Sequence, residues 1–292
     1  MEEKQFAFSV IGGDARYIEL IQFLQAQSHQ VYVYGFSNID FPDSVILCDR
    51  LEETIQKSTF IIGPIPCSQD NYTLFAPYHQ GSPILLKDLF ESLSKYHVFM
   101  AGYITPKVRE IAGDSFKIFD LLQREELAIY NAIPTSEGAI QIAMEQQPIT
   151  IHSSKCLVLG FGRCGKVLAH QLQGLGACVS VGVRSVKDIA YISTYGYQPL
   201  FLKDLKKEIH QFDFIFNTIP SLILDQSTLL YVNKGSIIID LASKPGGVDY
   251  EAAEKQGVKA LLCLGLPGKV APKTAGWIIK ETVLTICSEM RE

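Results

Sequence analysis

The sequence lacks the features that mark membrane proteins and nucleic-acid-binding proteins. Its 26 Lys and Arg are outnumbered by 31 Asp and Glu, and no run of five basic residues exists, so we expect no nucleic-acid groove. No stretch approaches the ~18 uninterrupted apolar residues that a membrane span needs. The N-terminal segment MEEKQFAFSVIGGDAR has no charged start, long apolar run or cleavage site of a signal peptide. We therefore expect a cytoplasmic protein that binds neither membranes nor nucleic acid.

Paired cysteines and several catalytic motifs are also missing. The 7 cysteines form no CxxC pair, and several lie in apolar stretches, which favours a reduced protein without a disulfide or a metal site. HExxH, GxSxG and P-loop motifs are absent. The last of the 6 histidines is His210, so none follows the fourth strand expected in the second half. A hydroxyacid dehydrogenase commonly protonates its carbonyl with a histidine from that region, which argues against this activity.

What the chain does have is a repeated alternation of short apolar runs and helical patterns. Its 292 residues suggest two domains. In the first half we expect strands in QFAFSVIGG, VYVYG, STFIIGPIP, HVFMAGYI and SFKIFDL, and helices in DARYIELIQFLQAQ and DLFESLSKY. In the second half we expect strands in CLVLG, CVSVGV, FDFIFNTI, SIIIDLA and KALLCLG, with QPLFL a weaker candidate. Strands separated by helices predict parallel sheets.

These patterns predict an α/β protein with two doubly wound parallel-sheet domains, of which the second is a Rossmann dinucleotide-binding domain. We place the N-terminal α/β domain at residues 1–133, a connecting helix at 134–150 and the Rossmann domain at 151–274. The helical pattern of 275–292 is expected to pack back on the first domain, by analogy with the last helix of many two-domain dehydrogenases.

A glycine-rich turn, GFGRCG, follows the strand CLVLG and precedes the helical segment VLAHQLQGLG. Gly160 permits the tight turn, Gly162 lets a pyrophosphate approach the backbone, and Gly165 lets the helix pack on the sheet. Arg163 and Cys164 lie in the same turn. Because the motif has the required strand–turn–helix–strand context, it predicts dinucleotide binding.

The first half contains only a degenerate version of this turn, VIGGDAR. It has no GxGxxG motif, and Asp14 stands where a phosphate would be repelled, so we expect a related fold without a nucleotide. Arg16 is either a substrate or interface residue or simply an arginine at the start of a helix.

The second strand of the Rossmann domain ends without the acidic residue of an NAD-specific site. VSVGV is followed by Arg184, Ser185 and, two residues later, Lys187. A carboxylate would repel a 2′-phosphate, whereas a guanidinium pairs with it. The sequence therefore predicts NADP(H), and the alternative is a solvated arginine at the end of a strand.

Three further strand ends should line the cofactor pocket, because ligands of open α/β sheets lie beyond the carboxyl ends of the strands. The fourth strand is closed by Asn217, Thr218, Ile219, Pro220 and Ser221, the fifth by Asp240, Leu241, Ala242 and the residues up to Gly247, and the sixth is followed by residues 266–274. Ordinary loop chemistry is the alternative for each of these residues.

With these motifs placed, the whole chain resembles the dipicolinate synthase A subunit family of endospore-forming bacteria. The resemblance runs through VIGGDAR, IYNAIPTSEG, VLGFGRCGK, NTIPS, DLASKPGG and LPGKVAPKTAG. It implies a two-domain NADP-binding oxidoreductase, distantly similar to alanine dehydrogenase and transhydrogenase nucleotide subunits. It also implies oxidation of dihydrodipicolinate to dipicolinate together with a flavoprotein-like B subunit, in the mother cell of a sporulating bacterium.

A dicarboxylate substrate requires cations, and the chain offers Lys244 and Lys273 in loops expected near the pocket. Glu137, at the expected start of the connecting helix, is a candidate proton acceptor, with a helix-capping role as the alternative. We also expect a homo-oligomer. Other hypotheses stay open: a non-catalytic NADP-binding regulatory subunit, or an alanine-dehydrogenase-like oxidoreductase acting on another small acid.

Overall fold

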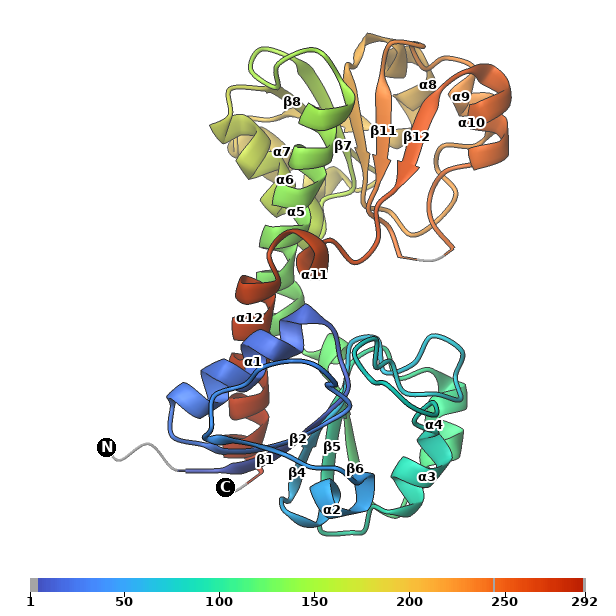
Figure 1. The fold of residues 1–292 in the computed structure, drawn as a ribbon. Coiled ribbons are helices and arrows are strands. Elements are labelled where there is room, and N and C mark those ends of the chain that lie inside the picture. The colour runs from blue at the N-terminus through green and yellow to red at the C-terminus, as the bar shows by residue number, and fades with distance from the viewer. Residues whose placement is uncertain (1–4, 244, 291–292) are drawn as a thin grey trace. The chain divides into compact units, whose positions relative to one another are not determined.

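Parallel strands form two six-stranded sheets, one in each of two units of the chain (Figure 1). The computed structural model describes residues 5–243 and 245–290. Unit 1 contains the chain up to Ala128 and again from Ala271 onward, whereas unit 2 contains Ile129–Val270. Among the described residues, no helix combines the length and the apolar character needed to cross a membrane.

The sheet of unit 1 has the strand order β3-β2-β1-β4-β5-β6, and all of its pairs are parallel. Its strands are Ala7–Ile11 (β1), Gln30–Tyr34 (β2), Val45–Leu47 (β3), Phe60–Ile62 (β4), Val98–Ala101 (β5) and Lys117–Asp120 (β6). Its helices are Ala15–Ala26 (α1), Leu51–Gln56 (α2), Leu86–Glu91 (α3), Pro106–Ala112 (α4), the short 3-10 helix Leu121–Gln123 (η1) and Pro272–Glu289 (α12).

The sheet of unit 2 has the corresponding order β12-β11-β10-β7-β8-β9, again all parallel. Its strands are Lys155–Leu159 (β7), Cys178–Val183 (β8), Gln198–Phe201 (β9), Phe214–Asn217 (β10), Ile237–Asp240 (β11) and Lys259–Leu262 (β12). Its helices are Arg163–Gly174 (α6), Val186–Thr194 (α7), Leu205–Glu208 (α8), Gln226–Leu229 (α9), Tyr250–Gln256 (α10) and Leu266–Val270 (α11), with 3-10 turns at Leu202–Asp204 (η2) and Ile209–Gln211 (η3).

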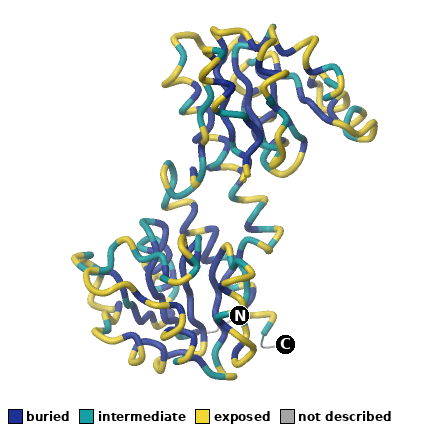
Figure 2. Tube along the Cα trace, turned by 90° about the vertical axis from the view of Figure 1, so that its right-hand side faces the viewer, coloured by how far each residue is buried: buried dark blue, intermediate teal, exposed yellow. Residues whose placement is uncertain are grey.

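Both sheets therefore have the doubly wound order in which the third strand pairs with the second and the first strand pairs with the fourth. This confirms the predicted fold class. The inner strands β1, β4 and β5 of unit 1 and β7, β10 and β11 of unit 2 are almost wholly buried (Figure 2), as expected for parallel strands with helices on both faces, whereas the edge strands β3, β6, β9 and β12 are largely exposed or half-buried. The crevice for a ligand in such a sheet lies where the order reverses, which is between β7 and β10 in unit 2.

The C-terminal helix α12 belongs to the core of unit 1, although β1 and α12 lie at opposite ends of the sequence. Ile278, Ile279, Val283 and Ile286 are all buried within the same apolar cluster as α1. At Gly276 the two helices come so close that an added Cβ would lie 2.5 Å from the carbonyl oxygen of Arg16. The helix is thus an integral part of unit 1 (Figure 1).

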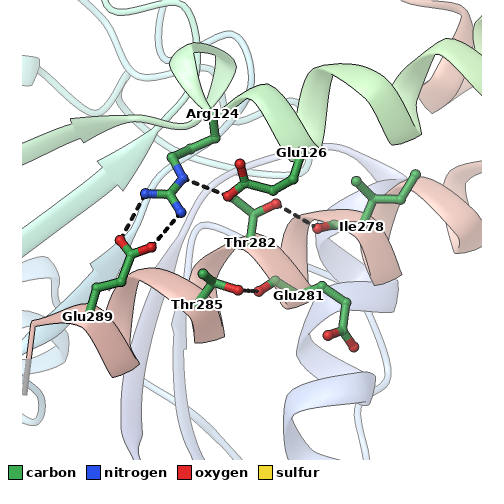
Figure 3. A network of polar contacts seen from close by, with 7 residues as sticks. All are labelled: Arg124, Glu126, Ile278, Glu281, Thr282, Thr285 and Glu289. Carbon is green, nitrogen blue, oxygen red and sulfur yellow. Dashed lines mark hydrogen bonds and ion pairs between the residues drawn. The ribbon is translucent and has the colours of Figure 1, made fainter.

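A polar network holds the far end of α12 (Figure 3). Arg124, just before helix α5 (Glu125–Gln146), donates two hydrogen bonds of 2.8 Å to the carboxylate of Glu289. Its Nε donates to Glu126 at 2.6 Å. Forked arginine–carboxylate pairs of this kind are directional as well as charge-assisted, so the network fixes the last turn of α12 against the start of α5.

Helix α5 differs from the expected connecting helix at 134–150. It begins at Glu125, well before Pro134, and ends at Gln146. A proline favours a helix start over a helix interior, because its ring and missing N–H disfavour the interior. Here Pro134 nevertheless lies inside the helix and is buried.

Candidate dinucleotide-binding site

The glycine turn of unit 2 lies directly after β7 and opens α6. Gly160 has a φ of 98°, and an added Cβ there would lie 2.5 Å from the Thr218 hydroxyl oxygen. A Cβ at Gly165 would overlap the carbonyl oxygen of Gly160, so these two positions need glycine for the protein's own packing. At Gly162, in contrast, an added Cβ would meet nothing within 4 Å. The turn is therefore tightly packed on the protein side and open at the one glycine that a pyrophosphate should approach.

The start of α6 offers the backbone donors that an anion requires. The first hydrogen bond of the helix runs from Lys166 N to the carbonyl of Gly162 at 3.0 Å, so the N–H groups of 163–165 precede it. Arg163 and Gly162 are exposed, whereas Cys164 is half-buried, and burial raises the pKa of its thiol. A buried neutral thiol is a poor nucleophile. The group of Cys164 that an anion at this helix start could bind is therefore its backbone N–H, and not its thiol.

A buried carboxylate organises the neighbouring strand ends. Asp240, at the end of β11, is fully buried and accepts hydrogen bonds from Asn217 Nδ2 at 2.8 Å and Tyr250 OH at 2.8 Å. It also accepts from the backbone N–H of Ala242 at 3.1 Å and of Gly247 at 3.0 Å. The carboxylate therefore fixes Ala242 and Gly247, two residues that follow β11, relative to the ends of β10 and β11.

Asn217 links this loop to the segment after β10. Its amide donates to the carbonyl of Ile219 at 3.1 Å, and its side-chain oxygen accepts from Ile219 N at 3.1 Å. Thr218 donates its hydroxyl to the carbonyl of Leu159 at 2.8 Å, at the end of β7. The structure thus brings the predicted cofactor segments, Thr218–Pro220 and Leu241–Ala242, to the same edge of the sheet as the glycine turn.

The hydrogen bonds of Asp240 are a feature that the sequence pattern does not predict, although Asn217 and Asp240 were both expected at strand ends that line the pocket. The signal was present, since Asn217 and Asp240 are polar residues that end two apolar strands. They are register partners in the β10–β11 pair. Burial and its bond to Asp240 raise the pKa of Tyr250, which keeps the phenol a hydrogen-bond donor.

Arg184, Ser185 and Lys187 follow β8 and surround the start of α7. All three are exposed, and Ser185 occupies the N-cap position without making a side-chain capping bond. Two cations and a free hydroxyl at a helix start suit a phosphate. The side chains that were expected to meet a 2′-phosphate are therefore available at the end of the second strand.

The corresponding turn in unit 1 is filled by the protein itself. Gly13 donates its N–H to the carbonyl of Phe75 at 3.0 Å, and a Cβ at Gly13 would overlap the ring of Tyr17. Asp14 caps α1 by accepting from Arg16 N at 3.1 Å and forms an ion pair with the Arg16 side chain at 2.8 Å. Arg16 also donates to the carbonyl of Ile65. Arg16 is thus a helix-start residue that is already paired.

Glu137 is not at the start of a helix, so its proposed capping role is wrong. The residue lies inside α5 and is exposed. It lines a groove whose opposite wall is the last part of α6, at Gln171, Gly174 and Leu175. The glycine turn is at the other end of α6, which has 12 residues and is therefore about 18 Å long. The structure does not bring Glu137 to the phosphate-binding end of this helix.

The structure describes only one of the two lysines that were predicted to bind the substrate carboxylates. Lys244 lies outside the described residues. Lys273 is exposed in the first turn of α12 and belongs to unit 1, whereas the glycine turn belongs to unit 2. The described part of the chain holds no group of three or more His, Cys, Asp or Glu residues that could bind a metal ion.

The geometry defines the class of fold: two doubly wound units, of which the second has an open Rossmann glycine turn. Transhydrogenase from Sinorhizobium meliloti shares this fold, with a TM-score of 0.72 at 15% identity over 97% of this chain and 94% of that one. At this identity the likeness concerns the fold alone.

More similar proteins place the chain within a family. Residues 7–122 match the family model of the N-terminal domain of the dipicolinate synthase A subunit. The dipicolinate synthase A subunit of Bacillus subtilis (strain 168) is 38% identical over 97% of this chain and 96% of its own length. The crystal structure of the dipicolinate synthase A subunit from Bacillus halodurans has a TM-score of 0.90 at 34% identity, covering 96% of this chain and 97% of that one. The chain belongs to the dipicolinate synthase A subunit family.

Proposed function

We propose that this chain is the NADP-binding subunit of an oxidoreductase that converts dihydrodipicolinate to dipicolinate. Membership of the dipicolinate synthase A subunit family is the observation that carries the proposal. The open glycine turn supports a dinucleotide, and the exposed Arg184 and Lys187 support one with a 2′-phosphate. When bound, the nicotinamide supplies the hydride acceptor.

The residues of unit 2 divide the work of holding this cofactor. The N–H groups at the start of α6 bind the pyrophosphate, while Arg184, Ser185 and Lys187 bind the adenosine end. Thr218–Pro220 and Leu241–Ala242 lie beside the turn, where they contact the nicotinamide half. The hydrogen bonds of Asp240 keep these segments in place without a ligand, which reduces the ordering that binding would otherwise require.

The reaction itself makes modest demands on acid–base groups. Loss of a hydride and a proton turns a dihydropyridine into an aromatic ring, so the product is strongly favoured. The site must chiefly hold a dianion with one carbon aimed at the cofactor, which is catalysis by positioning. We propose Lys244 and Lys273 as the cations that bind the carboxylates. Glu137 is retained only as a weak candidate for proton acceptor, because its groove lies at the opposite end of α6 from the glycine turn.

The proposal includes a partner and a cellular setting. The chain acts with a flavoprotein-like B subunit, and it assembles as a homo-oligomer in the mother cell of a sporulating bacterium. The test is dipicolinate formation from enzymatically generated precursor, measured for the two chains separately and in combination, and with NADP or NAD as acceptor. We expect full turnover only when both chains and NADP are present.

Two results would contradict the proposal in different ways. Full turnover by this chain alone would remove the requirement for the partner and support a self-sufficient dehydrogenase. Full turnover by the isolated B subunit, with this chain only binding NADP, would give this chain a regulatory role.

A further inference from the structure

A small cavity lies behind the glycine turn, in a part of unit 2 to which the proposed function assigns no role. Its volume is about 150 Å³, and its lining residues are Phe161, Lys166, His170, Tyr195 and Tyr197. These come from the glycine turn, from α6 and from the connection between α7 and β9. A cavity of about 150 Å³ is large enough for one benzene-sized ring.

Aromatic rings form three sides of this cavity. The ring centroids of Phe161 and Tyr195 are 6.2 Å apart, those of Phe161 and Tyr197 6.5 Å, and those of Tyr195 and Tyr197 6.2 Å. Gly196, with a φ of 80°, turns the chain between the two tyrosines, so that both can reach the same space. Such rings favour a flat aromatic ligand, which can stack on one ring and meet the edge of another.

The charged side chains at the cavity favour a ligand with negative charge. Lys166 Nζ lies 5.4 Å from the centroid of the Phe161 ring, and His170 follows one turn later on α6. None of the five lining residues is acidic. An aromatic cage usually suits a cation, but here a cation already lies over one ring and would repel a second. A carboxylate, in contrast, would gain a charge-assisted bond to Lys166.

The position of Phe161 connects this cavity to the cofactor. Phe161 stands between Gly160 and Gly162 and is only 8% exposed. A ligand that presses on its ring also acts on the backbone that approaches the pyrophosphate. The turn is closely packed, because a Cβ added at Gly160 would lie 2.5 Å from the Thr218 hydroxyl oxygen and a Cβ added at Gly165 would overlap the carbonyl of Gly160, so a displaced Phe161 ring would distort the turn.

We propose that this cavity is a regulatory site for a planar aromatic carboxylate, whose binding weakens the hold of the glycine turn on the dinucleotide. The chemistry of the ligand follows from the cavity, while its identification with the product of the reaction rests on the proposed function. Binding linkage requires the effect to be mutual. Saturating NADP should therefore weaken binding of the acid by the same factor.

The experiment is a calorimetric titration of the full chain with pyridine-2,6-dicarboxylate, with and without saturating NADP. Tyr195→Ala removes one wall of the cavity, and Tyr195 is 57% exposed, so the fold should tolerate its loss. Tyr191→Ala is the matched control, because Tyr191 lies on the preceding helix α7, is 49% exposed and does not line the cavity. Lys166→Met tests the cation, and cyclohexane-1,3-dicarboxylate tests the need for a flat ring.

We expect Tyr195→Ala and Lys166→Met each to weaken binding of the acid at least ~10-fold, while Tyr191→Ala stays within ~2-fold of the parent. Saturating acid should raise the Kd for NADP by ~5-fold or more in the parent, and this increase should vanish in Tyr195→Ala. The cyclohexane acid should bind at least ~10-fold more weakly than the pyridine acid. Without acid, all variants should bind NADP within ~2-fold of the parent.

The inference is overturned if Tyr195→Ala binds the acid as the parent does, if the two ring acids bind equally, or if the acid leaves the Kd for NADP unchanged. These measurements concern binding only. A chain that forms dipicolinate but shows no effect of Tyr195→Ala would refute the regulatory site and leave the proposed function standing. A chain that shows these effects but never forms dipicolinate would support the regulatory site and refute the proposed function.

Discussion

Replacing Gly162 by valine should separate cofactor binding from folding. A Cβ at this position meets nothing within 4 Å, and the backbone has a φ of −79°, which any residue can adopt. We therefore expect the free energy of unfolding to change by no more than about 1 kcal/mol, mostly because valine is a poorer helix N-cap than glycine.

The effect on the cofactor should be much larger. A valine side chain would occupy the space through which a pyrophosphate reaches the N–H groups at the start of α6. Each hydrogen bond to a charged group contributes about 1.5–3 kcal/mol. Loss of one or two of them predicts a ~100-fold weaker affinity for the dinucleotide, which corresponds to ~2.7 kcal/mol.

Two other glycines serve as controls for this experiment. Gly165→Ala should destabilise the fold itself by about 1–3 kcal/mol, because its Cβ would overlap the carbonyl of Gly160. Gly174→Ala, at the exposed end of α6 where a Cβ meets nothing, should leave both properties unchanged or slightly raise stability. The measurements are urea unfolding and titration with NADP. A Gly162→Val variant that binds NADP as tightly as the parent would refute the placement of the phosphate in this turn.

Three further outcomes are expected. Arg184→Ala should lose about 1.5–3 kcal/mol of affinity for NADP and none for NAD, and equal affinities for the two cofactors in the parent would contradict this. Tyr250→Phe should lower the free energy of unfolding by about 1.5–3 kcal/mol, because Asp240 loses a partner. Since the folded pKa of Tyr250 is raised from 10.0, that difference should be fully present below about pH 10 and decline above it in urea unfolding measured against pH. Lys244→Ala and Lys273→Ala should each raise KM for the dicarboxylate and leave the NADP affinity within ~2-fold, and an unchanged KM in the double variant would assign the carboxylates to other residues.

The sequence was most informative where one local pattern decides the structure. Short apolar runs identified β1, β2 and β4–β6, and the glycine spacing located the turn before α6. Val45–Leu47 was missed because two of its three residues are exposed, so it shows no buried run. The short helices α2 and α4, with 6 and 7 residues, were missed as well, since few residues are available to show a helical period.

The parts of the site that the sequence did not predict depend on packing between distant segments. Asp240 contacts Asn217 because β10 and β11 pair in the register that places the two residues side by side. No local spacing in the sequence predicts that register. The expected position of Glu137 was wrong because Pro134 suggests a helix start, although a helix can hold a proline where its surroundings compensate. The turn of unit 1 is closed by a hydrogen bond from Gly13 N–H to the carbonyl of Phe75. Because these two residues are far apart in the sequence, no local pattern predicts this contact.

The return of α12 to unit 1 sets the order in which the two units can mature during synthesis. The ribosome releases all of Ile129–Val270, the segment that forms unit 2, before it releases the helix that covers α1. Until then the apolar cluster of unit 1 that includes Leu20 and Leu24 of α1 lacks the residues that α12 contributes to it. Synthesis of unit 1 thus begins first and ends last. In a growing chain the Rossmann unit is the first unit whose whole sequence has been synthesised. A chain truncated after Val270 should therefore keep a folded unit 2 and expose the α1 face of unit 1, where a chaperone or protease would act.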